Sequence, residues 1–242
     1  MITATETPNR RTVLATITTI VALAASAVLA ACGTGATGTP TPPPGATSGT
    51  VDPFPRPTPA VATPEIMIIR HGEKPDGSEP GVDADGNEDD SSLTATGWTR
   101  AHRLVDMFDR AHASPRPELA RPTAIYAAGA NDNGEGQRTR ETVAPLANTL
   151  GIPVNTSFGR GDEKDLVKHV IASPGPMLIS WQHAGIPAIV DAFPKVTPDP
   201  PAHWPDDRFD VVWTLTKTAD GWHFAQVPEL ALPQDEASVI ED

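Results

Sequence analysis

Within residues 64–232, short apolar runs alternate with longer stretches in which apolar residues recur every three or four positions. The short runs have the length and composition of buried strands and occupy residues 65–69, 124–127 and 177–181. The longer stretches predict amphipathic helices over residues 97–110, 139–150, 162–172 and about 186–193. Strands alternating with helices predict an α/β domain, a three-layer α/β/α sandwich with a mostly parallel central sheet.

The C-terminal part follows a different pattern. Residues 210–216 and 221–227 are two strand-like runs separated by the turn 217–220, which predicts a hairpin at the sheet edge. The following segment 233–242 is acidic and short of apolar residues, and we expect it to be a loose tail.

Three positions suit helix ends. Either Thr94 or Thr96 can cap the helix that begins near residue 97, and Asp162 can cap the helix that follows it directly. Gly151 is a natural stop for the helix over 139–150.

The N-terminal segment has the layout of a targeting sequence. Arg10 and Arg11 precede an almost uncharged run over residues 13–31, which predicts a signal peptide over residues 1–31. The run is near the minimum length for a membrane span, so an uncleaved anchor is the alternative. Residues 9–14 resemble a twin-arginine export signal with departures, and the choice between Tat and Sec export stays open.

A lipid anchor is expected at Cys32. Residues 29–33, Leu-Ala-Ala-Cys-Gly, resemble the lipobox of bacterial lipoproteins, in which the cysteine is lipidated. Residues 32–63 are rich in Pro, Thr and Gly, a composition typical of an extended tether. We therefore expect an exported domain, attached to the outer face of the cell membrane only through the lipid on Cys32.

The net charge of −13 limits the choice of partner. An acidic surface disfavours nucleic acid and does not attract anionic lipid electrostatically. A small anion such as a phosphorylated substrate can still bind, provided that a local cationic pocket overrides the field of the whole protein.

Cationic and imidazole side chains follow each of the three buried strands. Arg70 and His71 come directly after the first, Arg138 ends the loop after the second, and His183 follows the third. Because the carboxyl ends of parallel strands meet at one sheet edge, we expect these residues to converge. Phosphoryl transfer through histidine needs a neutral imidazole, guanidinium groups for the phosphoryl oxygens and an acid for the leaving oxygen.

Four motifs in order resemble the histidine phosphatase superfamily, which includes the phosphoglycerate mutase-like enzymes. The segment 70–73 is Arg-His-Gly-Glu, and residues 93–101 are similar to the start of the family's first helix. Residues 138–142 are similar to its Arg-x-x-x-Thr segment, and residues 179–183 to the strand that delivers its second histidine. The resemblance spans roughly residues 66–193 and implies a phosphoglycerate mutase-like fold.

The resemblance also implies roles for individual residues. His71 would be the phosphorylated nucleophile, Arg70 and Arg138 would bind the phosphoryl oxygens, and His183 would donate a hydrogen bond to them. Glu73 would lie at the pocket rim. Arg140 is the alternative to Arg138, and a buried packing role is the alternative for His183.

The proton donor is open. One branch of the family has Asp after the second histidine, where this chain has Ala184; the other has a carboxylate some two dozen residues past the second arginine. Asp162 and Glu163 both lie there, and we favour Glu163 because Asp162 suits a helix cap. Glu73 remains a further candidate.

An acidic insertion over residues 76–90 separates the nucleophile from the first helix, and it carries seven carboxylates without Lys or Arg. It lacks the full pattern of a calcium loop, so a solvated charge run is the simpler interpretation. We expect it to overhang the pocket and to select against highly anionic substrates or for a cationic group.

The resulting hypothesis is a phosphomonoester hydrolase that acts through a phosphohistidine on His71, without metal or cofactor. The alternatives are a phosphomutase and a lipoprotein that binds phosphorylated ligands without turnover.

Overall fold

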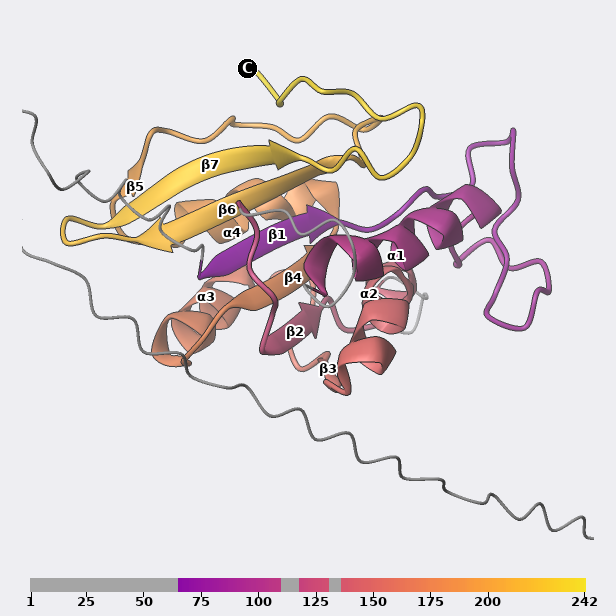
Figure 1. Ribbon diagram of the computed structural model, residues 1–242, viewed down its shortest axis with the longest axis horizontal. Helices are drawn as coiled ribbons and strands as arrows, with labels where there is room; N and C mark the ends of the chain where they lie inside the picture. The colour runs from indigo at the N-terminus through magenta and orange to yellow at the C-terminus, as the bar shows by residue number, and fades with distance from the viewer. Residues whose placement is uncertain (1–64, 110–117, 131–135) are drawn as a thin grey trace, which may run out of the picture. The chain divides into compact units, whose positions relative to one another are not determined.

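The computed structural model describes residues 65–109, 118–130 and 136–242 (Figure 1). The predicted signal peptide, the tether and Cys32 lie outside these residues. In chain order the helical elements are α1 (Ala95–Phe108), α2 (Gln137–Leu150), α3 (Glu163–Ala172), a 3-10 helix (His183–Gly185) and α4 (Ile186–Asp191). The strands are β1 (Ile66–Arg70), β2 (Ala124–Ala127), β3 (Val154–Asn155), β4 (Met177–Trp181), β5 (Val196–Thr197), β6 (Val211–Lys217) and β7 (Trp222–Pro228). None of the helices in the described ranges is long and apolar enough to cross a membrane.

The strands form one seven-stranded sheet in the order β3-β2-β4-β1-β6-β7-β5. Neighbouring pairs are parallel except at β6, which runs antiparallel to both β1 and β7. The predicted mostly parallel sheet is therefore confirmed. β4 lies in the middle of the parallel part, between β2 and β1, so three of the predicted strands are direct neighbours.

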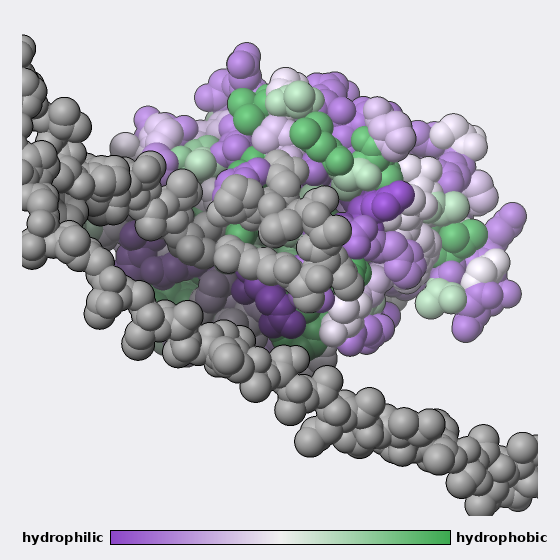
Figure 2. Space-filling model, in the orientation of Figure 1, coloured by the Kyte–Doolittle hydropathy of each residue, from purple (hydrophilic) through white to green (hydrophobic). Residues whose placement is uncertain are grey.

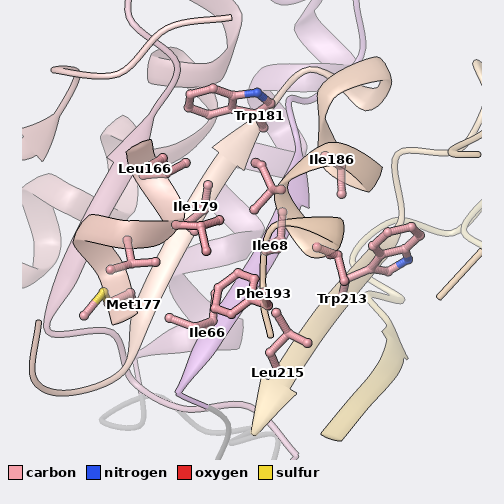
Figure 3. Packing of buried hydrophobic residues seen from close by; sticks show 14 of the residues in the cluster. Ile66, Ile68, Leu166, Met177, Ile179, Trp181, Ile186, Phe193, Trp213 and Leu215 are labelled. Atoms are coloured by element: carbon pink, nitrogen blue, oxygen red, sulfur yellow. The ribbon is translucent and has the colours of Figure 1, made fainter. Parts of the chain in front are cut away.

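The period of two along β1 divides the core between the two faces of the sheet. Ile66 and Ile68 pack against α3 and α4 on one face, as Figure 3 shows, with Leu166 and Ile186 supplied by those helices. The odd-numbered Met67 and Ile69 pack on the other face, against a cluster that includes residues of α1 and α2. Helices thus cover both faces, which confirms the three-layer α/β/α architecture.

The helix ends follow the local sequence. Thr94 is the N-cap of α1, and its Oγ1 accepts the Gly97 amide at 3.1 Å. Asp162 occupies the N-cap position of α3 but makes no capping bond, because its Oδ2 accepts the Gly159 amide instead. Gly151 ends α2 with a φ of 67°, in the left-handed region that favours glycine.

The predicted hairpin is present, as the antiparallel pair β6 and β7. Beyond it only the two-residue strand β5 pairs with β7, so the hairpin borders the sheet on that side (Figure 1). β3 and β5 were not expected, because strands of two residues are too short for a hydrophobic period to show.

The prediction of a loose C-terminal tail is wrong. Ile240 is buried in the same core cluster as residues of α3 and α4, and its backbone makes two hydrogen bonds with the Gln226 side chain of β7. Asp235 accepts the amides of Ala231 and Leu232 and pairs with Arg100. Charge and the scarcity of apolar residues suggested a solvated segment, but one isoleucine and one carboxylate anchor it through contacts distant in sequence.

Arg100 is a buried cation that joins four parts of the chain. Its guanidinium pairs with Glu73 at 2.7 Å, Glu229 at 2.8 Å and Asp235 at 2.7 Å. Burial raises the pKa of Glu229 to about 7, against the attraction of Arg100. Burial alone would lower the pKa of Arg100, but its carboxylate partners raise it, so Arg100 stays charged at any working pH.

Hydrophobic and hydrophilic side chains are mixed on the face of the described residues that Figure 2 shows. Among the described residues, the large hydrophobic side chains with most exposure are Leu230 and Val239.

We predict that Arg100→Ala destabilises the protein by roughly 3–5 kcal/mol, because it leaves buried carboxylates without their counter-charge. Arg103 is the matched control, since it lies on the same helix with a side chain 60% exposed and makes only a 3.8 Å surface pair with Asp106. Arg103→Ala should change the free energy of unfolding by no more than about 0.5 kcal/mol. Denaturant unfolding of both variants measures this, and equal effects would contradict the proposed anchoring role.

Candidate active site

Three of the predicted site residues lie together at the carboxyl ends of β1, β2 and β4. His71, Arg138 and His183 line one cavity of about 360 Å³, called here the histidine cavity. The register of β1 against β4 explains why: Arg70 is opposite Trp181, and the His71 amide donates to the Trp181 carbonyl at 3.1 Å. Both histidines therefore leave the sheet at the same edge. Among the described residues, those that line it are His71, Lys74, Gly136, Arg138, Thr139, Arg160, Gln182, His183, Ala184 and Gly185.

His71 is held in one orientation and one tautomer. Its Nδ1 lies 2.7 Å from the carbonyl oxygen of Gly72, and because a carbonyl only accepts, Nδ1 must carry the hydrogen. The other nitrogen, Nε2, then has a free lone pair. Burial above all, with the nearby Arg70 and Arg138, lowers the pKa of His71 to about 3, although the Gly72 bond acts in the opposite direction. The imidazole is consequently neutral and nucleophilic at physiological pH.

Gly72 is fixed from two sides, which keeps its carbonyl in place under His71. Its amide donates to Thr142 Oγ1 at 2.8 Å, and that hydroxyl donates in turn to the Arg138 carbonyl at 2.7 Å. The i,i+4 spacing from Arg138 to Thr142 thus ties the start of α2 to the nucleophile. On the other side the backbone approaches Gly97, where an added Cβ would lie 2.6 Å from the Glu73 carbonyl oxygen.

Arg70 is almost completely buried and presents one free edge. Its Nη1 donates to three backbone carbonyls, those of Pro205, Asp206 and Arg208, at 3.1, 2.7 and 3.0 Å. The Phe209 ring lies 3.8 Å from its Cζ. Nε and Nη2, which form the side-on bidentate edge of a guanidinium, have no hydrogen-bond partner among the described residues. Burial lowers the pKa of Arg70 to about 10, so it remains a cation.

His183 begins the 3-10 helix after β4. Its Nε2 lies 2.7 Å from Asp206 Oδ1, and its Nδ1 is buried without a partner in the described parts of the chain. Burial lowers the pKa of His183, and Arg70 lowers it further, whereas Asp206 raises it. The side chain is 26% exposed, which does not support the alternative of a fully buried packing histidine.

Arg138 and two further cations surround the histidines. Arg138 lines the cavity while its Nη1 donates to the Asp90 carbonyl at 3.0 Å. Arg140, the alternative to Arg138, is exposed and does not line the cavity. Lys74 and Arg160 line it as well. In a chain of net charge −13 this is a local cationic pocket of the kind that a small anion requires.

The three carboxylates considered from sequence do not line this cavity. Glu163 comes nearest: its Oε1 accepts the Trp181 Nε1 hydrogen at 3.2 Å, and the same carboxylate accepts the Gly161 amide. Asp162 faces Gly159, and Glu73 pairs with Arg100. The structure therefore does not bring Glu163, Asp162 or Glu73 into the cavity with His71.

A second cavity, of about 490 Å³, lies beside the first and shares Lys74 with it. We call it the acidic cavity, because Glu73, Asp206, Asp207, Asp210 and Glu236 are among the residues that line it. The front of the acidic insertion contributes Asp76, Ser78 and Glu79. The later turn is exposed and closes on itself, with Asp83 Oδ1 accepting the amides of Asp85 and Asn87 at 2.9 Å. Selection of substrates by this insertion stays a prediction.

Sequence reasoning missed the segment 205–209. It supplies three carbonyls and an aromatic ring to Arg70 and a carboxylate to His183. Its residues belong to no helix or strand and show no hydrophobic period. Lys74 and Arg160 were missed because isolated loop cations resemble ordinary surface residues.

No protein-family model matches the sequence, and no curated protein is significantly similar to it. Among solved structures, a mycobacterial glucosyl-3-phosphoglycerate phosphatase is similar over 66% of this chain and 96% of its own, with 15% identity and a TM-score of 0.43. A mycobacterial protein named hydrolase 2 covers 66% of this chain and 88% of its own, at 13% identity and a TM-score of 0.35. A candidate phosphohistidine phosphatase from Agrobacterium tumefaciens is similar over 66% of this chain and 93% of its own, with 13% identity and a TM-score of 0.35. These values are too low to assign an activity, which has to come from the site.

We predict that His71 is neutral, with its hydrogen on Nδ1, from pH 8 down to pH 5. The pKa of about 3 implies that protonation begins only well below this range, whereas an unperturbed histidine titrates near 6.5. Two-bond ¹H–¹⁵N correlation spectra of ¹⁵N-histidine-labelled protein report the tautomer directly, with His71→Gln identifying the resonance. A midpoint near pH 6.5, or a hydrogen on Nε2, would contradict the assigned geometry.

Proposed function

We propose that this protein is a phosphomonoester hydrolase that works through a phosphohistidine intermediate on His71, and that it is a divergent member of the histidine phosphatase superfamily. The proposal rests on one observation above all: a neutral imidazole with a free Nε2 lies among buried and half-buried arginines. An electrophile that suits such a site carries several negatively charged oxygens, and a phosphoryl group does so.

The proposed reaction assigns each residue a role. The Nε2 lone pair of His71 attacks phosphorus, while the Gly72 carbonyl stabilises the Nδ1 hydrogen as positive charge develops on the ring. The Nε and Nη2 edge of Arg70, which has no hydrogen-bond partner among the described residues, binds two phosphoryl oxygens, and Arg138, which lines the cavity, binds the phosphoryl group as well. His183 contributes a hydrogen bond to the phosphoryl group. Water then attacks the phosphohistidine and releases phosphate.

The proposed location is outside the cytoplasm. We propose that residues 1–31 direct export and that lipid on Cys32 attaches the chain to the membrane. An exported position favours hydrolysis over mutase chemistry, because the phosphorylated intermediates of metabolism are cytoplasmic.

We predict that the wild-type protein hydrolyses an activated aryl phosphate and forms an acid-labile, alkali-stable phosphoenzyme under rapid quench. His71→Ala should abolish the phosphoenzyme and lower kcat by about a thousandfold or more, because it removes the nucleophile. His102→Ala is the matched control: His102 is exposed on α1 and lines neither cavity, so activity should be unchanged. Chelator should leave the wild-type rate unaltered.

Each other outcome has a distinct meaning. Turnover without a phosphoenzyme, and insensitive to His71→Ala, would refute the covalent mechanism. A phosphoenzyme that returns its phosphoryl group to an alcohol rather than to water would identify a mutase. Binding of inorganic phosphate without turnover would leave the lipoprotein as a binding protein.

We predict that Cys32→Ser abolishes fatty-acid labelling and releases the protein from the membrane fraction. Cys32 is the only cysteine of the chain, so no other thiol can take up the lipid. Labelling with a fatty-acid analogue followed by membrane fractionation measures both effects. A Cys32→Ser protein that stays in the membrane fraction would instead support residues 13–31 as an uncleaved anchor.

A further inference from the structure

The proposed hydrolysis requires a proton for the leaving oxygen, and one carboxylate of the described chain contacts the catalytic residues directly. Asp206 Oδ1 lies 2.7 Å from Nε2 of His183. Its backbone carbonyl accepts Arg70 Nη1, also at 2.7 Å. One residue therefore touches both the second histidine and the buried phosphate-binding arginine.

The backbone around Asp206 is held firmly, although its side chain is 82% exposed. The flanking carbonyls of Pro205 and Arg208 also bind Arg70, and the Trp204 indole donates to the Arg208 carbonyl at 2.9 Å. Phe209 stacks on the same guanidinium. The segment 205–209 thus brings an accessible carboxyl group to the site on a fixed backbone, which is the combination that a proton donor needs.

The position of Asp206 also suits the leaving group. Asp206 lines the acidic cavity, whereas His71 and His183 line the histidine cavity. The bond between Asp206 and His183 therefore spans the boundary between the two. A phosphoryl group bound in the histidine cavity would have the Asp206 carboxyl group beside His183 at this boundary.

The other carboxylates are less suitable. Glu163 is outside the histidine cavity, with its oxygens occupied by Trp181 and Gly161. Both carboxylate oxygens of Glu73 accept hydrogen bonds from Arg100. Neither is in hydrogen-bond contact with His71, Arg70 or His183 among the described interactions.

We propose that Asp206 is the general acid and base of the hydrolysis that is itself proposed above. In the first step Nε2 of His71 forms a bond to phosphorus, the bond from phosphorus to the leaving oxygen breaks, and the Asp206 carboxyl proton passes to that oxygen. In the second step the Asp206 carboxylate takes a proton from water as the water oxygen attacks phosphorus. The bond from phosphorus to Nε2 then breaks, and its electron pair returns to the ring.

The test compares substrates of different leaving-group ability in Asp206→Asn. Asparagine retains an oxygen and the backbone but carries no acidic proton. Hydrolysis of an alkyl phosphate, whose leaving alcohol needs a proton, should fall by about a hundredfold or more. For 2,4-dinitrophenyl phosphate, whose leaving group needs no proton, kcat/KM should change little, because it reports the phosphorylation of His71. Its kcat should fall and the phosphoenzyme should accumulate, because the attacking water loses its base. The plot of log kcat/KM against leaving-group pKa should become steeper.

Asp191→Asn is the control, with the same change of charge at an exposed residue that lines neither cavity. It should leave both substrates and the slope unaltered. Asp206→Ala is informative about positioning: if alanine lowers kcat/KM for both substrates equally and asparagine restores it, Asp206 only orients His183 and the proposal is wrong.

Glu163→Gln tests the competing assignment, in which Glu163 is the proton donor. A selective loss on alkyl phosphates in Glu163→Gln, with none in Asp206→Asn, would overturn the assignment to Asp206. Both outcomes presuppose a wild-type phosphoenzyme on His71. If the proposed function itself is wrong, the wild-type protein will show no turnover. That result is distinct from an error in the assignment of Asp206.

Discussion

The parallel register between β1 and β4 is the constraint on which the site depends. Arg70 lies opposite Trp181, and the His71 amide continues the ladder to the Trp181 carbonyl. Because the two strands end at the same level, His71 and His183 enter one cavity although 112 positions separate them in the chain. A slip of one residue would turn Arg70 and the alternating core residues of β1 to the opposite faces of the sheet. The apolar packing on both faces therefore fixes the position of the histidines as well as the fold.

The electrostatic environment gives His71 and Arg70 different charges within the site. Burial keeps His71 neutral while Arg70, equally buried, remains charged because its intrinsic pKa is so much higher. The carbonyls of segment 205–208 bind one side of the guanidinium and leave its bidentate edge unused by the described chain. A nucleophile without charge next to fixed cations is an arrangement in which a phosphoryl group is attracted and the attacking lone pair stays available.

The sequence predicted the parts of the structure that have a period or lie in one contiguous motif. The runs at 65–69, 124–127 and 177–181 correspond to the three strands β1, β2 and β4, and the residues shortly after them include His71 and His183. The contacts of Asp206 with Arg70 and of Asp235 with Arg100 could not be predicted, since they join residues more than a hundred positions apart without any local pattern. Glu163 satisfied the spacing expected of a proton donor, but spacing along a chain does not determine whether a side chain enters a cavity.

The central claim is that the phosphoryl group is transferred twice, first to Nε2 of His71 and then to water. The stereochemical course at phosphorus measures this most directly. An isotopically chiral phosphorothioate monoester would be hydrolysed in isotopically labelled water, and the configuration of the released thiophosphate determined. Two in-line displacements invert the centre twice, so the account predicts overall retention. Overall inversion would mean that water attacks the substrate directly, and would contradict a covalent role for His71.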